Sequence, residues 1–262
     1  MLRLLRVGSG RPLRVGRWAG VEVQADASWP VVALALTGTV WADAAAGGGR
    51  PVGVGFGVAA VVTAGFFVSV LVHELAHALE ARHRGATVRG VILLPFGGIT
   101  DLAPGRRRAR DELAASAVGV FTSAVLGAGL GIAATVARVA GTPDAALAAG
   151  MLAWLNIGLA VVNLLPGLPF DGGRLLGTFL ARVTRNEGRS VAVAAGAGVV
   201  LAGLVLAAGV VQVVRGDNTV AGFWLIGLGW VLLRSARRAR PMVGPDVPAP
   251  DAVVRAEPER RR

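Results

Sequence analysis

The sequence predicts an all-α polytopic membrane protein with about six transmembrane helices and a small membrane-associated β-hairpin or sheet. Hydrophobic residues make up 54% of the 262 residues, and the mean hydropathy is +0.62. Several apolar stretches are long enough to cross a bilayer core of roughly 30 Å, which needs about 20 helical residues. The 27 basic residues are all arginine, and they fall between and beyond those stretches.

The apolar stretches place the predicted spans at about 28–46, 53–80, 112–138, 145–166, 190–214 and 218–234. Asp26 and Asp43 leave the first span only a short uncharged stretch, so a shallow or tilted span is its alternative. The fifth and sixth spans contain little besides Ala, Val, Gly and Leu, and we expect them to pack rather than to carry chemistry. The glycines of the third and fourth spans would allow close helix contact in lipid.

The expected organisation has three parts. Residues 1–27 form a cytoplasmic N-terminal segment with a short strand, and it lacks the apolar core of a signal peptide. Residues 28–240 form one six-span domain whose core spans are 53–80, 112–138 and 145–166. Residues 241–262 are rich in Pro, Arg and acidic residues, which predicts a disordered cytoplasmic tail.

Arginine distribution predicts the orientation in the membrane. Cytoplasmic loops carry the excess of basic residues, and arginine-rich and arginine-poor connections alternate along this chain. The rich segments precede span one and follow spans two, four and six, whereas Arg50, Arg138 and Arg215 are almost alone in the others. Both termini are therefore expected in the cytoplasm. The net charge of +11 reflects this topology, so we expect no nucleic-acid partner.

The second span contains a candidate metal-binding motif. The segment from Gly53 to Ala81 has no ionisable residue in its first twenty positions and then supplies His73, Glu74 and His77 as H-E-x-x-H. Two histidines four apart lie about 40° apart around a helix, so both imidazoles can reach one Zn²⁺ while the glutamate addresses its water. Ionisable groups within a membrane span are costly and usually functional. The pattern predicts a metal hydrolase.

A catalytic zinc site usually has three protein ligands, and without cysteine the third must be a histidine or a carboxylate. Glu80 is too close to His77 on a continuous helix to complete a tetrahedron easily. His83 has the metzincin spacing, but Glu80 stands where that pattern needs a glycine for the turn. His83 would then point about 240° away from His77, so we interpret it as an interfacial, solvated residue.

Asp171 is the better candidate for the third ligand. It lies in NLLPGLPFDGGR, residues 163–174, where Pro166 and Pro169 break the fourth helix and two glycines follow. A broken helix at the end of a span can direct polar groups into a membrane cavity. Taken alone, the same letters fit an ordinary turn with an aspartate cap at a helix start.

A further apolar segment, residues 86–104, forms two short runs broken by Pro95, Gly97 and Gly98. This pattern is typical of a hairpin. Apolar backbone of this kind is tolerated near a membrane only against protein or beside a cavity, which suggests a sheet edge next to the metal site. Such an edge could accept an extended peptide by strand addition. The alternative is a simple amphiphilic connector.

Together, H-E-L-A-H at residues 73–77 and N-x-x-P-x-x-P-x-D-G-G at residues 163–173 resemble the motifs of the site-2 protease family of intramembrane zinc metalloproteases. LPFGGI at 94–99 resembles that family's membrane-associated hairpin, and WAGVEVQADASW at 18–29 its short strand before the first span. The resemblance covers roughly residues 15–235. No insertion is long enough for a PDZ domain, and no CBS pair follows the last span, so the form is compact.

The resemblance implies one Zn²⁺ per chain and an activity. It implies that His73, His77 and Asp171 bind the zinc, that Glu74 is the general base, and that Asn163, Gly97 and Gly98 contact substrate; these assignments rest on the motifs quoted above. The expected activity is intramembrane proteolysis of a single-span signalling protein, such as an anti-sigma factor or a membrane-tethered transcription-factor precursor. The expected partners also include the lipid bilayer and a second copy of the chain or a regulatory membrane protein.

Two other functions remain open from the sequence. A membrane metal-binding or transport protein could use the histidine pair without hydrolysis, although a transport site needs no base at the position of Glu74 and would spread its ligands over several spans. An inactive protease-like scaffold could keep the fold without the reaction. The complete set of His73, Glu74, His77 and Asp171 argues against the scaffold.

Overall fold

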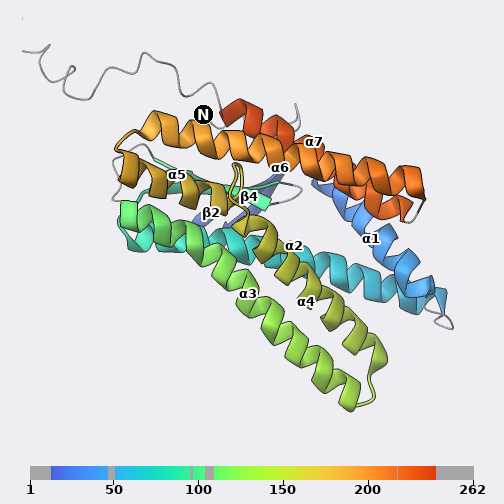
Figure 1. Cartoon of the computed structure of the whole chain (residues 1–262). Helices are drawn as coiled ribbons and strands as arrows, with labels where there is room; N and C mark the ends of the chain where they lie inside the picture. Colours follow the sequence, from blue (N-terminus) through green and yellow to red (C-terminus); the bar gives the residue numbers. More distant parts are fainter. Residues whose placement is uncertain (1–12, 47–50, 95–96, 104–108, 217, 240–262) are drawn as a thin grey trace, which may run out of the picture.

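The computed structural model describes residues 13–46, 51–94, 97–103, 109–216 and 218–239. Figure 1 shows long helices arranged around a small sheet. In chain order the elements are β1 (Leu13–Trp18), β2 (Val21–Ala25), α1 (Trp29–Ala46), α2 (Val52–His83), β3 (Val88–Leu94), β4 (Gly97–Leu102), α3 (Ala109–Val139), α4 (Pro143–Leu164), α5 (Asp171–Thr184), α6 (Glu187–Arg215) and α7 (Thr219–Ala239).

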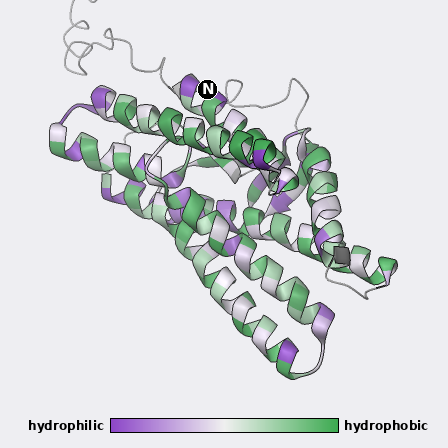
Figure 2. Cartoon of the chain, turned by 45° about the vertical axis from the view of Figure 1, so that its right-hand side comes forward, coloured by the Kyte–Doolittle hydropathy of each residue, from purple (hydrophilic) through white to green (hydrophobic). Residues whose placement is uncertain are grey.

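Within the described residues, five helices are long and apolar enough to cross a membrane: α2, α3, α4, α6 and α7. They correspond to the second to sixth predicted spans, so the multi-pass helical class is confirmed. The first predicted span forms α1, an 18-residue helix that is not among the five. The count of six spans is therefore not confirmed. Figure 2 shows hydrophobic colours along the long helices.

The strands form one sheet with the order β1-β2-β3-β4. β1 pairs antiparallel with β2, β2 parallel with β3, and β3 antiparallel with β4. The predicted hairpin exists as β3–β4. The short strand predicted within residues 18–29 exists as β2, which belongs to the same sheet. The pairing of β2 with β3 extends one residue beyond β2, because the backbone amide of Asp26 donates a hydrogen bond to the Leu93 carbonyl. β1 and β4 are the two edges.

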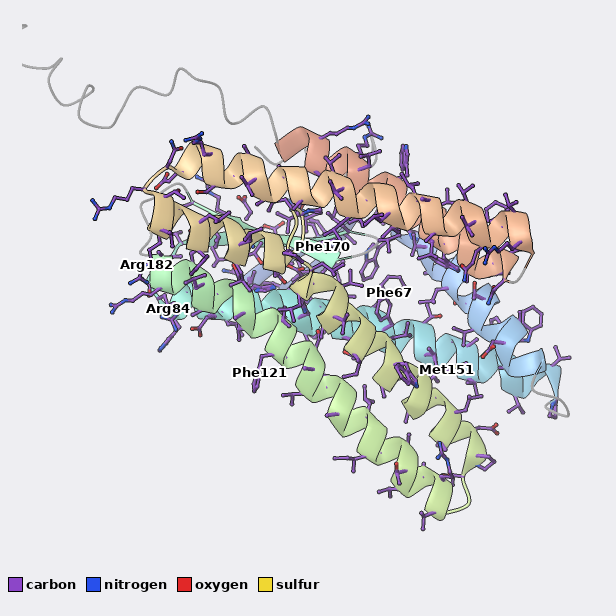
Figure 3. The ribbon with its side chains drawn as sticks, in the orientation of Figure 1. Phe67, Arg84, Phe121, Met151, Phe170 and Arg182 are labelled. Carbon is purple, nitrogen blue, oxygen red and sulfur yellow. The ribbon has the colours of Figure 1, made fainter. Side chains whose placement is uncertain are left out.

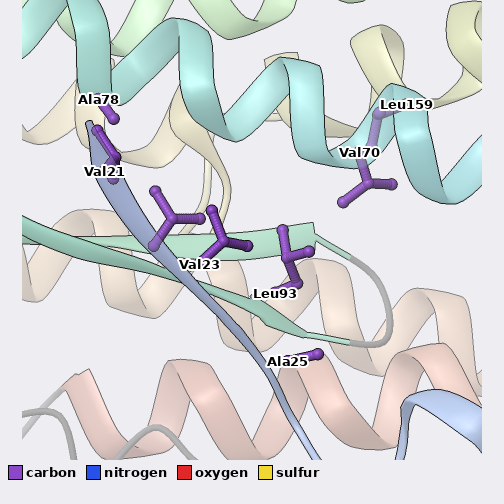
Figure 4. Close-up of a cluster of buried hydrophobic side chains, with 8 residues drawn as sticks. Val21, Val23, Ala25, Val70, Ala78, Leu93 and Leu159 are labelled. Carbon is purple, nitrogen blue, oxygen red and sulfur yellow. The ribbon is translucent and has the colours of Figure 1, made fainter. Parts of the chain in front are cut away.

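The sheet buries its apolar face under α2. Val21 and Val23 of β2 alternate with exposed or half-exposed positions, and they pack with Leu93 of β3 against Val70 and Ala78 of α2. Figure 4 shows these side chains between the helix and the strands. Because buried and more exposed residues alternate along β2, the contacts of the buried residues fix the position of the sheet along α2. Consequently β4 lies beside the helix that carries the histidines.

Two helix hairpins cover the remaining sides. α3 packs along α4, and α6 packs along α7, as Figure 1 shows. Glycines permit close approach: a Cβ on Gly127 of α3 would lie 2.8 Å from Ile157 of α4. Outward positions are apolar; Phe121 is 68% exposed and points away from the bundle in Figure 3. Large exposed apolar side chains on such helices suit lipid rather than water.

One helix was not among the predicted elements, although a helix start at Asp171 was the alternative interpretation of that segment. The chain after the fourth span forms a separate helix, α5, rather than a loop leading into the next span. α5 has an extended residue, Phe170, at its N-cap and ends at Arg185 in the left-handed region with φ 54°. It lacks the length and continuous apolarity of a span, which is why hydropathy alone did not show it. The predicted disordered tail, residues 241–262, lies outside the described residues.

Candidate metal centre

The H-E-x-x-H segment lies on the buried side of α2. His73, Glu74 and His77 have exposed fractions of 1%, 5% and 5%. The helix runs through them without proline, so the two imidazoles project from adjacent turns of one face. Their ring centroids are 4.7 Å apart and their planes are nearly perpendicular, at 83°. The sequence prediction of a shared histidine face agrees with this arrangement.

Asp171 reaches the same point from the start of α5. The carboxylate is at the first helical position, where the helix dipole favours a negative charge. Gly172 and Gly173 let the chain turn tightly, because a Cβ on either would collide with backbone atoms of Leu164 or Gly167. The Leu168 amide also donates to the Ala194 carbonyl of α6. Backbone packing, more than a side-chain cap, therefore fixes this carboxylate.

Three candidate ligand atoms form a small triangle. The Nε2 atoms of His73 and His77 are 3.1 Å apart, and Oδ2 of Asp171 lies 3.3 Å from the first and 3.1 Å from the second. Ligands about 2.0–2.1 Å from a tetrahedral zinc lie roughly 3.3–3.4 Å from one another. Two neutral imidazoles and a carboxylate are also a donor set that zinc accepts. The residues present therefore fit this metal.

The carboxylate of this triangle is ionised. Burial alone would raise the pKa of Asp171, but the neighbouring His73 and His77 side chains outweigh burial and lower that pKa below its ordinary value. Asp171 is therefore negatively charged at neutral pH. It is ready to serve as an anionic ligand.

The outer nitrogens of both rings are held by α3. His73 Nδ1 lies 2.9 Å from Oγ of Ser123, and His77 Nδ1 lies 2.5 Å from the carbonyl oxygen of Ala115. Metal-bound histidines commonly donate their second ring N–H to such a partner, which sets the ring orientation and the tautomer. The two Nε2 atoms are thereby left to face Asp171.

The Glu74 side chain contacts β4 of the sheet. Oγ1 of Thr100 in β4 lies 3.5 Å from both the backbone oxygen and Oε2 of Glu74. A Cβ on Gly98 would come within 2.6 Å of Glu74 Cδ and Cγ, so the strand lies directly on the glutamate side chain. Of the predicted hairpin glycines, Gly98 is thus in contact with the site, and Gly97 begins the same strand.

The other sequence candidates lie elsewhere. Glu80 forms an ion pair with Arg84, with 2.6 Å between Oε1 and Nε, and His83 is exposed, as expected for a solvated residue. Figure 3 shows Arg84 at the end of the molecule where Arg182 also lies. Asn163 is half-buried, and its Nδ2 donates to the Leu159 carbonyl of its own helix. This hydrogen bond joins Asn163 to its own helix and not to the triangle.

Sequence reasoning missed the contribution of α3. Ser123, Gly119 and the backbone of Ala115 are spaced by four residues and lie against the two imidazoles. The third span was assigned only close packing through its glycines. A serine four residues after a glycine in an otherwise apolar span was the available signal, but serines in membrane helices commonly bond to their own backbone.

Comparisons with known proteins agree on one family. The model of peptidase family M50 matches residues 131–208, which include Asp171. Two curated relatives are each designated "Putative zinc metalloprotease": one from Synechocystis sp. is 31% identical over 86% of this chain, and Rip3 from Mycobacterium tuberculosis is 35% identical over 85%. This chain covers 58% and 57% of their respective lengths.

The fold agrees as well. The solved structure of the site-2 protease from Methanocaldococcus jannaschii superimposes with a TM-score of 0.61. The match covers 88% of this chain and 95% of the other, at 24% identity. At that identity the likeness establishes a shared fold. It includes most of both chains, so the helices and the sheet belong to one common architecture.

Proposed function

Because the chain belongs to peptidase family M50, the site-2 protease family, we propose that it is a zinc endopeptidase that hydrolyses peptide bonds in or near transmembrane segments. One observation carries the proposal. Two histidines of a membrane-spanning helix and an aspartate 94 residues further along the chain bring three ligand atoms within 4.8 Å of one another, beside a buried glutamate. Ionisable side chains inside an apolar membrane helix are energetically unfavourable, so this cluster is expected to be functional.

His73, His77 and Asp171 would hold the zinc. When bound, zinc polarises a peptide carbonyl and makes a water molecule acidic enough to attack near neutral pH. Glu74 is the general base: it takes a proton from the attacking water and gives it to the leaving amine. Its position supports this role, because Glu74 follows His73 on the buried side of α2 and its carboxylate is not one of the three ligand atoms.

The β4 strand is the proposed substrate platform. A helical peptide bond is shielded by its own hydrogen bonds, so a transmembrane substrate must unwind locally before cleavage. β4 is an edge strand that pairs with β3 on one side, and an extended peptide added to its other side would run past Glu74. Gly97 and Gly98 are the proposed substrate contacts on this strand: Gly98 places no side chain between the strand and Glu74, and Gly97 begins the strand.

Asn163 is the proposed second contact. It lies on the last turn of α4, eight residues before Asp171, and one N–H of its amide is used by the Leu159 carbonyl. The second N–H of the same nitrogen can hold a substrate carbonyl. This assignment makes Asn163 a substrate-binding residue rather than part of the metal centre.

The proposed location is the cell membrane with both termini in the cytoplasm. Arginine-rich segments flank the end of α2 that carries the site, which supports cleavage near the cytoplasmic face. A substrate with one span and a cytoplasmic signalling part suits this geometry, such as an anti-sigma factor or a membrane-tethered transcription-factor precursor. Cleavage would release that part from the membrane.

The test compares wild type with Glu74→Gln. A tagged candidate substrate is co-expressed with each form, and cleavage is followed by the size of the tagged fragment. Glu80→Gln is the matched control, because Glu80 lies on the same helix but pairs with Arg84 at its end. Wild type and Glu80→Gln should cleave while Glu74→Gln should not. Equal cleavage by Glu74→Gln would refute the assignment.

Metal transport and an inactive scaffold are the competing functions. Neither is favoured by a specific observation: the ligand atoms gather at one point rather than along a path, and the base is present. Zinc flux in proteoliposomes that disappears in His73→Ala, without any peptidase activity, would support transport. A purified protein that binds zinc but cleaves none of its membrane partners would support the scaffold.

A further inference from the structure

α3 provides none of the three ligand atoms, yet it contacts both metal-site histidines through one face. We propose that α3 is the orienting element of the zinc site, with Ser123 as the positioning residue for His73 and Gly119 as the residue that keeps the metal position open. The inference rests on the proposed zinc site, and it adds a third helix to the two that supply ligands.

The hydrogen bond between His77 and Ala115 has only one possible direction. The Ala115 carbonyl can only accept, so His77 Nδ1 must carry the proton and donate it. The tautomer then leaves Nε2 with a lone pair, and Nε2 is the atom 3.1 Å from Oδ2 of Asp171. A backbone oxygen in a helix has little freedom to move. α3 therefore sets both the tautomer and the tilt of the His77 ring.

The His73 side depends on a side chain. Oγ of Ser123 lies 2.9 Å from His73 Nδ1, and both residues are almost completely buried, at 0% and 1% exposure. With Ser123 as acceptor, Nδ1 carries the proton and Nε2 is free to bind metal. The serine hydroxyl provides the outer partner that a metal-bound histidine normally has. Its removal would leave a buried N–H without a partner.

Gly119 lies between these two contacts and faces the ligand nitrogens. A Cβ at this position would collide with Nε2 and Cε1 of His77 and would lie 2.9 Å from Nε2 of His73. These are the atoms that would bind the metal, and the rings cannot retreat because α3 holds their other nitrogens. Any side chain at 119 would consequently occupy the space in which the zinc must sit.

α3 also contains two residues that suit control substitutions. Ser116 is 1% exposed, and its hydroxyl is a buried oxygen for which the described residues provide no partner. Removal of that hydroxyl should be neutral or slightly stabilising. Gly129 is the matched glycine, because a Cβ there meets nothing within 4 Å. Both controls change the same residue type on the same helix.

The first experiment measures zinc affinity of the purified full chain in detergent by competition with a chelator. Ser123→Ala should weaken zinc binding about 10- to 100-fold, and Ser116→Ala should leave it unchanged. Cobalt substitution provides a second readout, because its visible bands report ligand geometry: they should shift in Ser123→Ala only. Wild-type affinity with unshifted bands in Ser123→Ala, or an equal loss in Ser116→Ala, would overturn the role of Ser123.

The second experiment tests Gly119. Gly119→Ala should hold no zinc while retaining the elution volume and the helical circular dichroism of the wild type, and Gly129→Ala should bind one zinc per chain. Zinc bound normally by Gly119→Ala would overturn the proposal. Neither experiment uses peptidase activity as a readout. A wild type that binds zinc but cleaves nothing would therefore refute the proposed function and leave these results standing.

Discussion

The contact between β4 and Glu74 predicts a loss of rate without a loss of metal. In Gly98→Ala the new Cβ would start 2.6 Å from Cδ and Cγ of Glu74, whereas ordinary contact begins at 3.4 Å, so the glutamate must retreat by roughly 0.8 Å. A displacement of about 1 Å at a catalytic group can cost about 100-fold in rate. This corresponds to about 2.7 kcal/mol in the activation barrier.

The assay measures initial cleavage rates of a transmembrane peptide in proteoliposomes, together with zinc per chain in the same preparation. Gly98→Ala should cleave about 100-fold more slowly and still bind one zinc, because Glu74 is not one of the three proposed ligands. Gly158→Ala is the control, since a Cβ at that position of α4 meets nothing within 4 Å. A Gly98→Ala rate above half of wild type would refute the reasoning, and so would a parallel loss of zinc.

Further predictions concern the ligand set and the packing of the sheet. Asp171→Asn removes the proposed anionic ligand, so zinc affinity should fall by more than the about 100-fold expected for loss of an outer hydrogen-bond partner, as chelator competition would detect. His83→Ala should change neither zinc content nor cleavage rate, because His83 is exposed at the end of α2. Trp29→Phe removes the indole hydrogen bond to the Leu94 carbonyl but keeps a ring against Phe67. It should lower the free energy of unfolding by about 0.5–1.5 kcal/mol, measured in a denaturant titration; an unchanged midpoint would contradict this.

Much of the fold could be predicted because the bilayer simplifies the problem. Long apolar stretches must be helices, since no water is present to satisfy an open backbone. α5 was missed for the same reason: it begins with Asp171 and two glycines and contains Arg174 and Arg182, so it has no span-like pattern. The pairing of β2 with β3 was also unpredicted, because those strands are separated by two helices and parallel pairing leaves no turn signature.

The candidate site could be predicted where its function depends on particular side chains. His73, Glu74, His77 and Asp171 are unusual in apolar surroundings, so they stand out. The α3 contribution does not stand out, because a backbone carbonyl has no sequence signature and glycine and serine are common in packed membrane helices. Only the three-dimensional contact between α3 and the imidazoles distinguishes their role.

The division of the site among elements has a mechanistic consequence. The proposed ligand nitrogens of α2 are held by α3, the carboxylate is held by the backbone around α5, and the proposed base, Glu74, contacts the sheet. An extended substrate added to β4 would press on the strand that touches the base and would leave the ligands unaffected. Substrate binding can then adjust the position of the base while the metal position stays constant. This arrangement would let a peptide in the correct register complete the catalytic geometry, whereas a helical segment that fails to pair with β4 would pass the zinc without being cleaved.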